Sequence, residues 1–427
     1  MASTLEALVR KRSTLTRAWL AIQRNGRLSK SPETRAEIKA FAENSTVHLE
    51  RIQSQLRKTT FVFKPAKGVK AKKPGKAGFR PLVIAPVESR IVQRAVHDVL
   101  LTVPGIEALI RTPYSFGGVK KHENDEFSAV PAAIKAVLEG IGSGGAYIMR
   151  SDISKFFTRI PKAEVRKIVA AVIEEPGFLN LYDQAVTAEL INMKELREDA
   201  KAFPIEDLGV AQGNSLSPLL GNLLLKDFDE QLNAIPGIRC IRYIDDFILL
   251  GPNRYVIGKA FEKAKQLLNK WQMTLAKNKT EGGSSQQRFE FLGIEFDDGF
   301  LRPSSASRAR LHSSTRNLLL ESQKSLLKYK STKVIEKREA VLRTLVTLSD
   351  TMNGWAMHYR ICNDSLCLQK LDGQIAKLVD EYLAVYRSVR NNVGVDSTWS
   401  LMGIQSLDAV EKSSFLWPRS KTKAHTS

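Results

Sequence analysis

The chain has 427 residues and a formal net charge of +20, with 65 Lys and Arg against 45 Asp and Glu. That length suffices for two or three domains, and the positive surplus indicates a polyanionic partner, with nucleic acid as the first candidate. No apolar run is long enough to cross a bilayer, the N-terminus has no signal-peptide core, and only three cysteines are present, so we expect a cytoplasmic protein without a membrane partner.

Residues 1–60 predict a polar helical extension without recognisable chemistry. Ser31 and Pro32 have the pattern of a helix start, with Ser as the N-cap and Pro at the first helical position.

Residues 64–80 are rich in Lys, Gly and Pro, which predicts a flexible basic loop. A strand from Arg80 and a helix over 88–101 are expected to follow. The loop lysines are candidates for nucleic-acid binding, namely Lys64, Lys67, Lys70, Lys72 and Lys73. A solvated linker is the other interpretation of such a loop.

The segment 113–125 predicts a polar loop with a double glycine, and 128–141 predicts a helix. Next, an apolar strand that starts at Tyr147 ends on Asp152. Residues 161–200 predict further helices. At 208–225 a glycine loop leads into a helix, which we expect Ser217 to cap and Pro218 to begin.

The stretch 238–250 predicts a strand, a tight turn and a second strand, with Asp245 and Asp246 at the tip. Asp is also an ordinary turn residue, so this pair alone leaves a structural role open. A second strand end at Asp152 favours a site instead. Three carboxylates at two strand ends would form an oxygen-rich site suited to Mg²⁺, and two such ions are the usual clamp for in-line attack at phosphorus.

After this hairpin the sequence predicts a helix over 254–276, a polar Gly/Ser loop, and a hairpin over 289–301 with Asp298 and Gly299 as its turn. From about 305 the chain predicts basic helices, on which Lys324 and Lys328 are candidates for contact with a duplex backbone. A solvated helix face is the alternative. The last ten or so residues predict disorder.

Taken together, five segments in order resemble the motifs of a reverse transcriptase. They are Asp152 with an aromatic residue five positions on, Gln212-Gly213 with Ser217-Pro218, Tyr243-Ile244-Asp245-Asp246, Lys279-Thr280, and Phe291-Leu292-Gly293. The resemblance covers roughly residues 60–300.

The resemblance implies a role for each matched residue. Asp152 and Asp245 would hold two Mg²⁺ ions with help from Asp246 and from Ile153, next in the chain. Phe157 would exclude a ribose 2′-hydroxyl. The other residues implied in binding the deoxynucleotide are Arg80, Gln212, Gly213 and Lys279, and Tyr243 would contact nucleic acid. Lys279 would protonate the leaving pyrophosphate, with Lys277 close enough to compete.

The fold class implied is α+β, a right-hand polymerase with fingers, an antiparallel palm sheet and a helical thumb. The expected divisions are a helical extension over 1–60, fingers over 61–145, a palm over 146–302 with a fingers insertion at about 160–205, and a thumb and tail over 303–427.

Within the family, the chain is similar to compact bacterial reverse transcriptases of the unknown and abortive-infection groups, which act in antiphage defence and are related to group II intron and retron enzymes. The resemblance implies a structured non-coding RNA as template, deoxynucleotides as substrates and cDNA as product. No RNase H, integrase or endonuclease domain is expected, and the retron Asn-Ala-x-x-His and Val-Thr-Gly motifs are absent as written. Template, primer, trigger and oligomeric state stay open.

Two alternatives remain. One is a retron-like or intron-like polymerase with the same chemistry in a different system. The other is an RNA-binding scaffold with a vestigial active site, which the complete set of carboxylates disfavours.

Overall fold

The computed structural model describes residues 4–29, 31–72, 78–127, 129–204, 207–394 and 397–405. The chain forms two compact units, Met1–Gln287 and Arg288–Ser427. Lys73 and the predicted C-terminal tail lie outside the described residues. The assignment of segments to fingers, palm and thumb remains a prediction.

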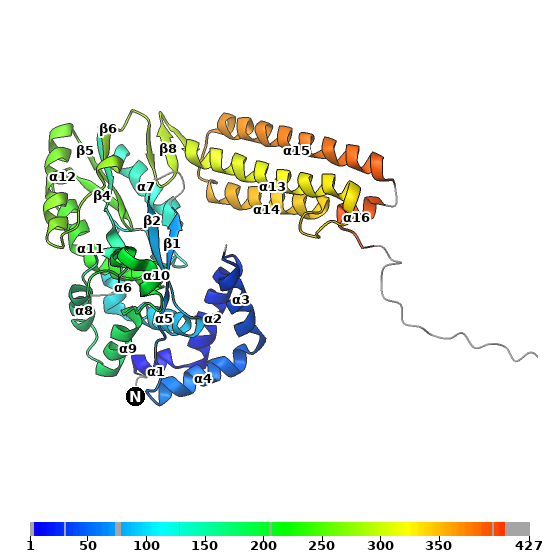
Figure 1. Ribbon diagram of the computed structural model, residues 1–427. Helices are drawn as coiled ribbons and strands as arrows, with labels where there is room; N and C mark the ends of the chain where they lie inside the picture. Colours follow the sequence, from blue (N-terminus) through cyan, green and yellow to red (C-terminus); the bar gives the residue numbers. More distant parts are fainter. Residues whose placement is uncertain are drawn as a thin grey trace, which may run out of the picture. The chain divides into compact units, whose positions relative to one another are not determined.

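The N-terminal extension is helical, as predicted. Its helices are α1 (Leu5–Val9), α2 (Arg12–Arg27), α3 (Pro32–Glu43) and α4 (Ser45–Arg57). The Ser31 side chain caps α3 by accepting a hydrogen bond from the Thr34 amide at 3.2 Å. Helices α1, α2 and α3 pack against α5 (Val87–Leu100) (Figure 1). The extension is therefore part of the core of the first unit.

The basic segment contains a strand, so the prediction of a loop over 64–80 was wrong for its first half. Strand β1 (Lys67–Lys72) pairs antiparallel with β2 (Phe79–Ile84). Gly68 is buried, and a Cβ there would lie 2.7 Å from a methyl carbon of Leu196. Backbone pairing and this close approach override a composition that disfavours strands.

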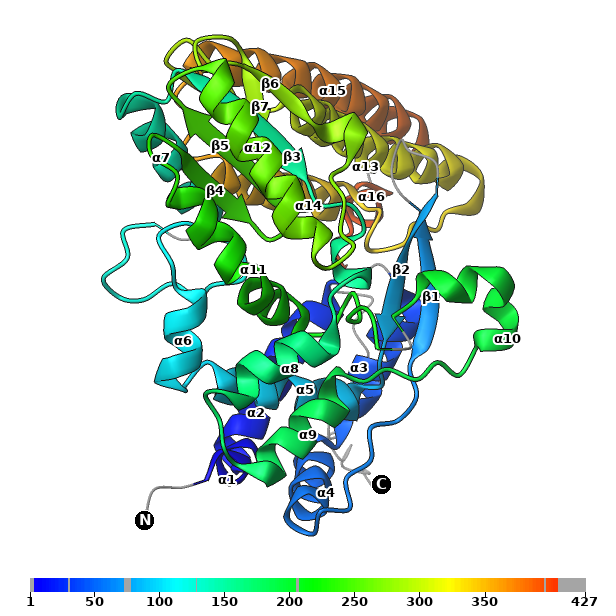
Figure 2. The same cartoon turned by 90° about the vertical axis from the view of Figure 1, so that its left-hand side faces the viewer.

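A four-stranded antiparallel sheet carries the residues of the candidate site. Its strand order is β4-β5-β3-β6, formed by β3 (Tyr147–Asp152), β4 (Arg239–Tyr243), β5 (Asp246–Gly251) and β6 (Glu281–Ser284). The helices α7 (Ala129–Gly142), α11 (Ser217–Asn233) and α12 (Arg254–Asn269) pack on it (Figure 2). Phe247 stacks edge-on against Phe228 of α11, whereas Leu250 lies against Gly140 of α7. Because side chains alternate along a strand, α7 and α11 cover opposite faces of this sheet.

Two further predictions near this sheet were wrong. The Gly/Ser segment is strand β6 rather than a loop, since Gly282 leaves room for Met149, whose sulfur would lie 2.9 Å from an added Cβ. Helix α12 ends at Asn269 and not at 276, because the chain turns at Gln272 (φ 54°) and runs along the end of β3.

Ser217 does not cap its helix. It is the first residue of α11, and its hydroxyl donates to the carbonyl oxygen of Ala211 at 2.8 Å. The loop before α11 is instead closed by Asn214, whose side-chain oxygen accepts from the Leu216 amide at 3.0 Å. The other helices of the first unit are α6 (Pro104–Ile110), α8 (Lys162–Ala170), α9 (Pro176–Val186) and α10 (Met193–Leu196), with 3-10 turns at Phe156–Thr158, Arg197–Ala202 and Lys277–Lys279.

The second unit begins with a three-stranded sheet of β7 (Phe289–Phe291), β8 (Ile294–Asp297) and β9 (Phe300–Pro303). Asp298 and Gly299, both with positive φ, form the predicted turn between β8 and β9. Four helices follow, α13 (Ser305–Thr332), α14 (Val341–His358), α15 (Ser365–Val393) and α16 (Thr398–Met402). They enclose a core around Leu326 and Tyr382.

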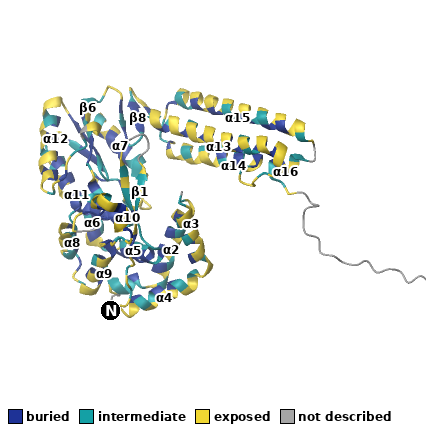
Figure 3. Cartoon of the chain, viewed as in Figure 1, coloured by how far each residue is buried: buried dark blue, intermediate teal, exposed yellow. Residues whose placement is uncertain are grey.

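The predicted α+β class, with an antiparallel sheet and a helical C-terminal unit, is confirmed. In the first unit, one buried core includes residues of the N-terminal helices, of α5 and α9, and of the four-stranded sheet with the helix faces that pack on it (Figure 3). None of the helices within the described ranges has the length and apolar content that crossing a bilayer requires.

Candidate active site

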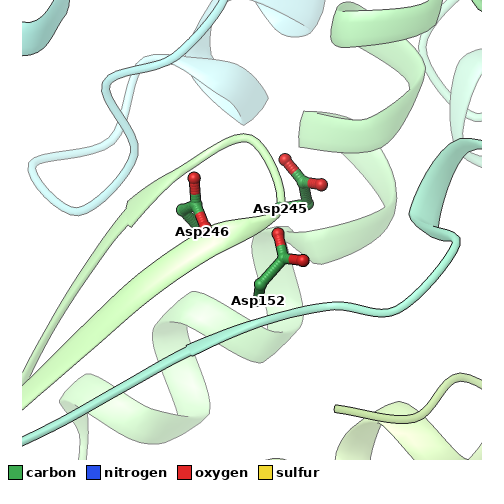
Figure 4. A group of neighbouring side chains, drawn as sticks. All are labelled: Asp152, Asp245 and Asp246. Carbon is green, nitrogen blue, oxygen red and sulfur yellow. The ribbon is translucent and has the colours of Figure 1, made fainter. Parts of the chain in front are cut away.

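Three carboxylates meet at one end of the four-stranded sheet. Asp152 is the last residue of β3 and Asp246 the first of β5, and the two are direct cross-strand partners. Direct partners share one face of a sheet, with Cβ atoms roughly 4.5–5.5 Å apart. Asp245 lies in the preceding turn, and one oxygen from each side chain lies within 4.8 Å of the others (Figure 4). The predicted cluster is therefore formed, although Asp246 belongs to the strand and not to the turn.

The turn that carries Asp245 has an unusual backbone. Ile244 has φ 60°, a conformation that is disfavoured for a β-branched residue. A two-residue hairpin turn favours positive φ at its first position because this matches the twist of the strands. Such strained residues persist when the surrounding structure holds them, and they gather at functional sites.

A glycine loop supports this turn from one side. The Phe116 amide donates to the Arg242 carbonyl at 3.0 Å, so the loop runs along β4. Gly117 packs so closely that an added Cβ would lie 2.7 Å from Ile244 Cγ1 and 2.8 Å from the Ile244 nitrogen. The double glycine predicted as part of a polar loop is thus a contact surface for the turn.

A buried ion pair supports the turn from beneath. Arg242 is only 1% exposed and donates two hydrogen bonds to Asp229 of α11, from Nε at 2.8 Å and from Nη2 at 2.7 Å. Its Nη1 donates to the carbonyl oxygen of Ile244 at 2.8 Å and to Asn222 Oδ1 at 3.0 Å. The Asn222 amide donates in turn to the Gly117 carbonyl at 2.8 Å. One guanidinium therefore connects the helix, the glycine loop and the turn beside Asp245.

The carboxylates repel one another. Burial, and then the neighbouring Asp152 and Asp246, raise the pKa of Asp245 to about 7. Burial and Asp152 likewise raise the pKa of Asp246 to about 6. Lys279 is the counter-charge, and its ammonium contacts the Asp152 carboxylate. Burial by itself lowers the pKa of Lys279, but the contact with Asp152 outweighs burial, and the pKa of Lys279 is raised overall.

The donor set fits a divalent cation. Three carboxylates lie close together with the ammonium of Lys279 at one of them, and the pKa values of Asp245 and Asp246 are raised. Mg²⁺ and Ca²⁺ prefer such oxygen ligands. Across the described parts of the chain, no other group of three or more His, Cys, Asp or Glu side chains converges in this way. Ile153 is buried beside the cluster, and its amide donates to the Asp245 carbonyl at 3.0 Å. A role for Ile153 as a metal ligand remains a prediction.

Phe157 and the glycine loop before α11 lie side by side. The Val210 amide donates to the Phe157 carbonyl at 2.7 Å, and the half-buried Phe157 ring packs on Phe156, with centroids 5.3 Å apart. The Gln212 carbonyl accepts from the Val83 amide at 3.0 Å. Gly213 has φ 117°, which favours glycine. Two residues implied in nucleotide binding, Phe157 and Gln212, are thus linked through one loop.

The other predicted residues are spread more widely. Arg80 is exposed on β2, and Tyr243 is half-buried at the end of β4, where burial raises its pKa. Lys67 and Lys72 are exposed on β1, whereas Lys70 forms an ion pair with Asp199 at 2.8 Å and Lys64 forms one with Glu88 at 2.9 Å. Lys324 and Lys328 are exposed on α13, in the second unit. The side chain of Lys277 is not among those described.

Sequence reasoning did not identify Arg242, Asp229 or Asn222 as parts of the site. A signal was present, since Arg242 interrupts an apolar strand. Asn222 and Asp229 are seven residues apart on an otherwise apolar helix face, which places them on the same side two turns apart. Buried polar groups at such positions need partners, and here they are partners of one another.

Comparison with known proteins identifies the family. Residues 71–296, more than half of the chain, match the family model described as reverse transcriptase (RNA-dependent DNA polymerase). Protein YkfC of Escherichia coli is 26% identical over 250 residues, covering 50% of this chain and 62% of that protein. An uncharacterised 91 kDa protein in the cob intron of Schizosaccharomyces pombe is 23% identical over 182 residues, covering 43% of this chain and 20% of that protein.

Similar solved structures include a partial Cas6-RT-Cas1–Cas2 complex, at a TM-score of 0.36 and 22% identity, covering 63% of this chain and 43% of that one. Another is apo telomerase from Candida tropicalis, at a TM-score of 0.39 and 14% identity, covering 55% of this chain and 54% of that one. The chain spans less than two thirds of the length of the curated relatives it matches. With the family match and the carboxylate cluster together, this chain belongs to the reverse transcriptase family, the RNA-dependent DNA polymerases.

Proposed function

We propose that this protein is an RNA-directed DNA polymerase that joins deoxynucleotides by metal-assisted attack of a 3′-hydroxyl on a triphosphate. The observation that carries the proposal is the convergence of Asp152, Asp245 and Asp246 at adjacent strand ends, within a chain of the reverse transcriptase family.

The cation we propose is Mg²⁺, held by Asp152 and Asp245 with Asp246 assisting, because its preference for oxygen ligands and substrate phosphates fits this donor set. When bound, two such ions supply activation of the attacking hydroxyl and stabilisation of the leaving oxygens. The protein's contribution is geometry, since the paired strands and the buried Arg242 hold the carboxylates in place before substrate arrives.

Around this centre we assign the remaining roles. Phe157 would stand against the sugar and exclude a 2′-hydroxyl by a steric clash, beside Gln212 and Gly213 in the same loop contact. Arg80 would bind the triphosphate through its forked guanidinium. Lys279 is our candidate for protonating pyrophosphate, since its ammonium already lies at the Asp152 carboxylate and is released when a cation replaces it there.

We further propose that the template is a dedicated structured non-coding RNA and that copying it serves antiphage defence. This rests on the resemblance of the motif set to compact bacterial defence enzymes. The other candidate is an intron-associated enzyme, favoured by the similarity to the cob-intron protein of Schizosaccharomyces pombe.

The chemical test compares the wild type with Asp245→Asn and with Asp152→Asn in primer extension on an RNA template. We expect product formation to fall by about 10³-fold or more while RNA binding is retained, since removing a group that acts on the transition state affects the chemical step. Extension that persists in both variants would reject the assignment and leave the RNA-binding scaffold as the better description.

The biological test is to sequence the RNA and DNA that co-purify with the protein from its native host, together with phage plating. One abundant structured RNA with complementary DNA, and protection lost with Asp245→Ala and Asp246→Ala together, are the expected results. Recovery of intron RNA, or of a random mixture of cellular RNA, would refute the defence assignment. It would not bear on the proposed polymerase activity.

A further inference from the structure

A cavity separate from the carboxylate cluster lies between β2, α5 and the Gln212–Gly213 loop. Its volume is about 200 Å³. The residues that line it come from the N-terminal extension (Ser29, Thr34), from the segment through β2 to α5 (Lys64, Val83, Ser89, Arg90, Gln93), and from the loop before α11 (Gln212, Gly213, Asn214). None of the three aspartates and neither Lys279 nor Phe157 lines this cavity.

Arg90 is the unexplained group in the cavity wall. Its Nη1 is buried and has no hydrogen-bond partner among the described residues. Burial lowers the pKa of Arg90, and the negative charge of Glu37 opposes that lowering. Its neighbour on the same helix, Arg94, has the ordinary arrangement, with Nε 2.9 Å from Asp98 Oδ1. A half-buried guanidinium with one buried, unsatisfied donor is costly, so an anionic partner is the missing element.

Other polar side chains that line the cavity already have hydrogen-bond partners within the protein. The Ser89 hydroxyl accepts from the Lys64 amide at 3.2 Å. The side-chain amides of Gln93 and Asn214 donate to the Ala185 carbonyl, at 3.1 Å and 2.9 Å. The charges facing Arg90 are Lys64, whose ammonium pairs with Glu88, and Glu37, whose Oε1 accepts from the Val87 amide at 2.9 Å. Arg90 is therefore the cation here without an ion-pair partner among the described residues.

We propose that the Arg90 cavity binds a phosphodiester group of a single nucleic-acid strand that passes the Gln212–Gly213 loop. The bidentate donors of Arg suit a phosphate. About 200 Å³ is below the roughly 300–1,000 Å³ typical of whole-ligand pockets, so one phosphate with part of its nucleotide fits and a duplex does not. Gln212 and Gly213 line the cavity as well, so the strand would pass beside the incoming nucleotide, and the test below distinguishes strand binding from triphosphate binding.

This inference rests on the proposed function only in taking the strand to be the polymerase's nucleic-acid substrate. It gives the helical extension a part in binding, because Ser29 and Thr34 form one wall of the cavity.

The test measures binding of a short 2′-O-methyl oligouridylate to the full chain, without divalent cation or nucleotide, across a salt series. Arg90→Met is expected to lower affinity about tenfold and to reduce the slope of log K against log salt by about 0.7, the value for one phosphate on a single strand. Arg90→Met is also expected to leave the melting temperature of the free protein unchanged or higher, because it removes a buried donor nitrogen that has no hydrogen-bond partner. Arg94→Met is the matched control, with a lower melting temperature and an unchanged slope.

A second measurement changes the charge of the oligonucleotide, one phosphate at a time. Neutral methylphosphonate groups are placed in the oligonucleotide one linkage at a time, and each affinity is measured with wild type and with Arg90→Met. We expect one linkage whose neutralisation weakens the wild type and leaves Arg90→Met unaffected.

The inference is overturned if Arg90→Met binds the oligonucleotide like the wild type, or if it loses as much thermal stability as Arg94→Met. It is also overturned if Arg90→Met weakens binding of a deoxynucleoside triphosphate while strand binding is kept, since the site would then be a nucleotide site. These readouts need no polymerisation, so a chain that binds the strand through Arg90 but makes no DNA would refute the proposed function and not this inference.

Discussion

Burial and the neighbouring carboxylates of Asp152 and Asp246 all raise the pKa of Asp245. Its pKa of about 7 and that of Asp246 of about 6 lie above the ordinary value near 4 for Asp. The folded, cation-free protein therefore holds protons that the unfolded chain has released between about pH 4 and pH 7. Stability from these groups is present at low pH and is lost as the pH rises through that window.

We predict that binding of Mg²⁺ strengthens as the pH rises from about 6 to 8, because the carboxylates must lose their protons to hold a cation. Titration calorimetry at several pH values measures this. In chelator, the contribution of these carboxylates to the melting temperature should fall as the pH rises from about 4 to 7, and Asp245→Asn should flatten that fall. A cation affinity that does not change with pH would show that these carboxylates are not the ligands.

Substitution of Arg242 tests whether its buried ion pair with Asp229 stabilises the fold, positions the turn beside Asp245, or does both. Arg242→Met leaves Asp229 buried without its partner, and we expect a loss of about 3–5 kcal/mol in unfolding free energy. Adding Asp229→Leu should restore most of that stability, since a buried pair can often be replaced by apolar residues. Chemical denaturation measures both variants.

The double variant then separates two roles. It still lacks the hydrogen bond from Arg242 Nη1 to the Ile244 carbonyl. We expect its kcat to stay at least about tenfold below the wild type, with little change in KM, because the turn beside Asp245 is no longer fixed. Full recovery of kcat along with stability would make the pair purely structural.

At the scale of elements, the loop that carries Gly117 packs against the turn beside Asp245. Gly117→Ala places a methyl group 2.8 Å from the backbone nitrogen of Ile244, and backbone cannot move aside as a side chain can. We predict a fall in kcat of about 10²-fold with nucleic-acid binding retained, from a displacement of the carboxylates of about 1 Å.

Gly258 provides the matched control for this substitution. It lies within α12 with nothing within 4 Å of an added Cβ, so Gly258→Ala should stabilise the helix by up to about 1 kcal/mol and leave kcat unchanged. If the two alanine variants were equally active in primer extension, the glycine loop would not position the turn that carries Asp245.

For the whole molecule, the net charge of +20 favours association with a polyanion. We predict that affinity for RNA falls steeply as salt rises, with a slope that counts the neutralised phosphates. Lys67→Ala together with Lys72→Ala should lower the slope by up to about two contacts, because both side chains are exposed on β1.

Lys70 is the control on the same strand, since its ammonium already pairs with Asp199 at 2.8 Å. Lys70→Ala should change the slope less than either neighbour does. If the slope of log K against log salt does not change when Lys67 and Lys72 are both replaced, other cationic side chains neutralise the RNA phosphates.

The sequence by itself determined the elements with strong local signals. The apolar strand ending on Asp152, the hairpin with Asp245 and Asp246, the Ser31 cap of α3 and the Asp298-Gly299 turn all follow from periodicity and turn chemistry, and the structure has each of them. The order of the motifs was enough to indicate the family.

Only the tertiary structure decided which backbone groups found partners. The lysine-rich β1 and the glycine-rich β6 are strands because β2 and β3 lie beside them, and the composition of a segment does not record which strand pairs with it. The same holds for Arg242 with Asp229, and for Arg90 in its cavity. Each is an ordinary cation in the sequence, and only burial and the presence or absence of an anion beside it give it a distinct role.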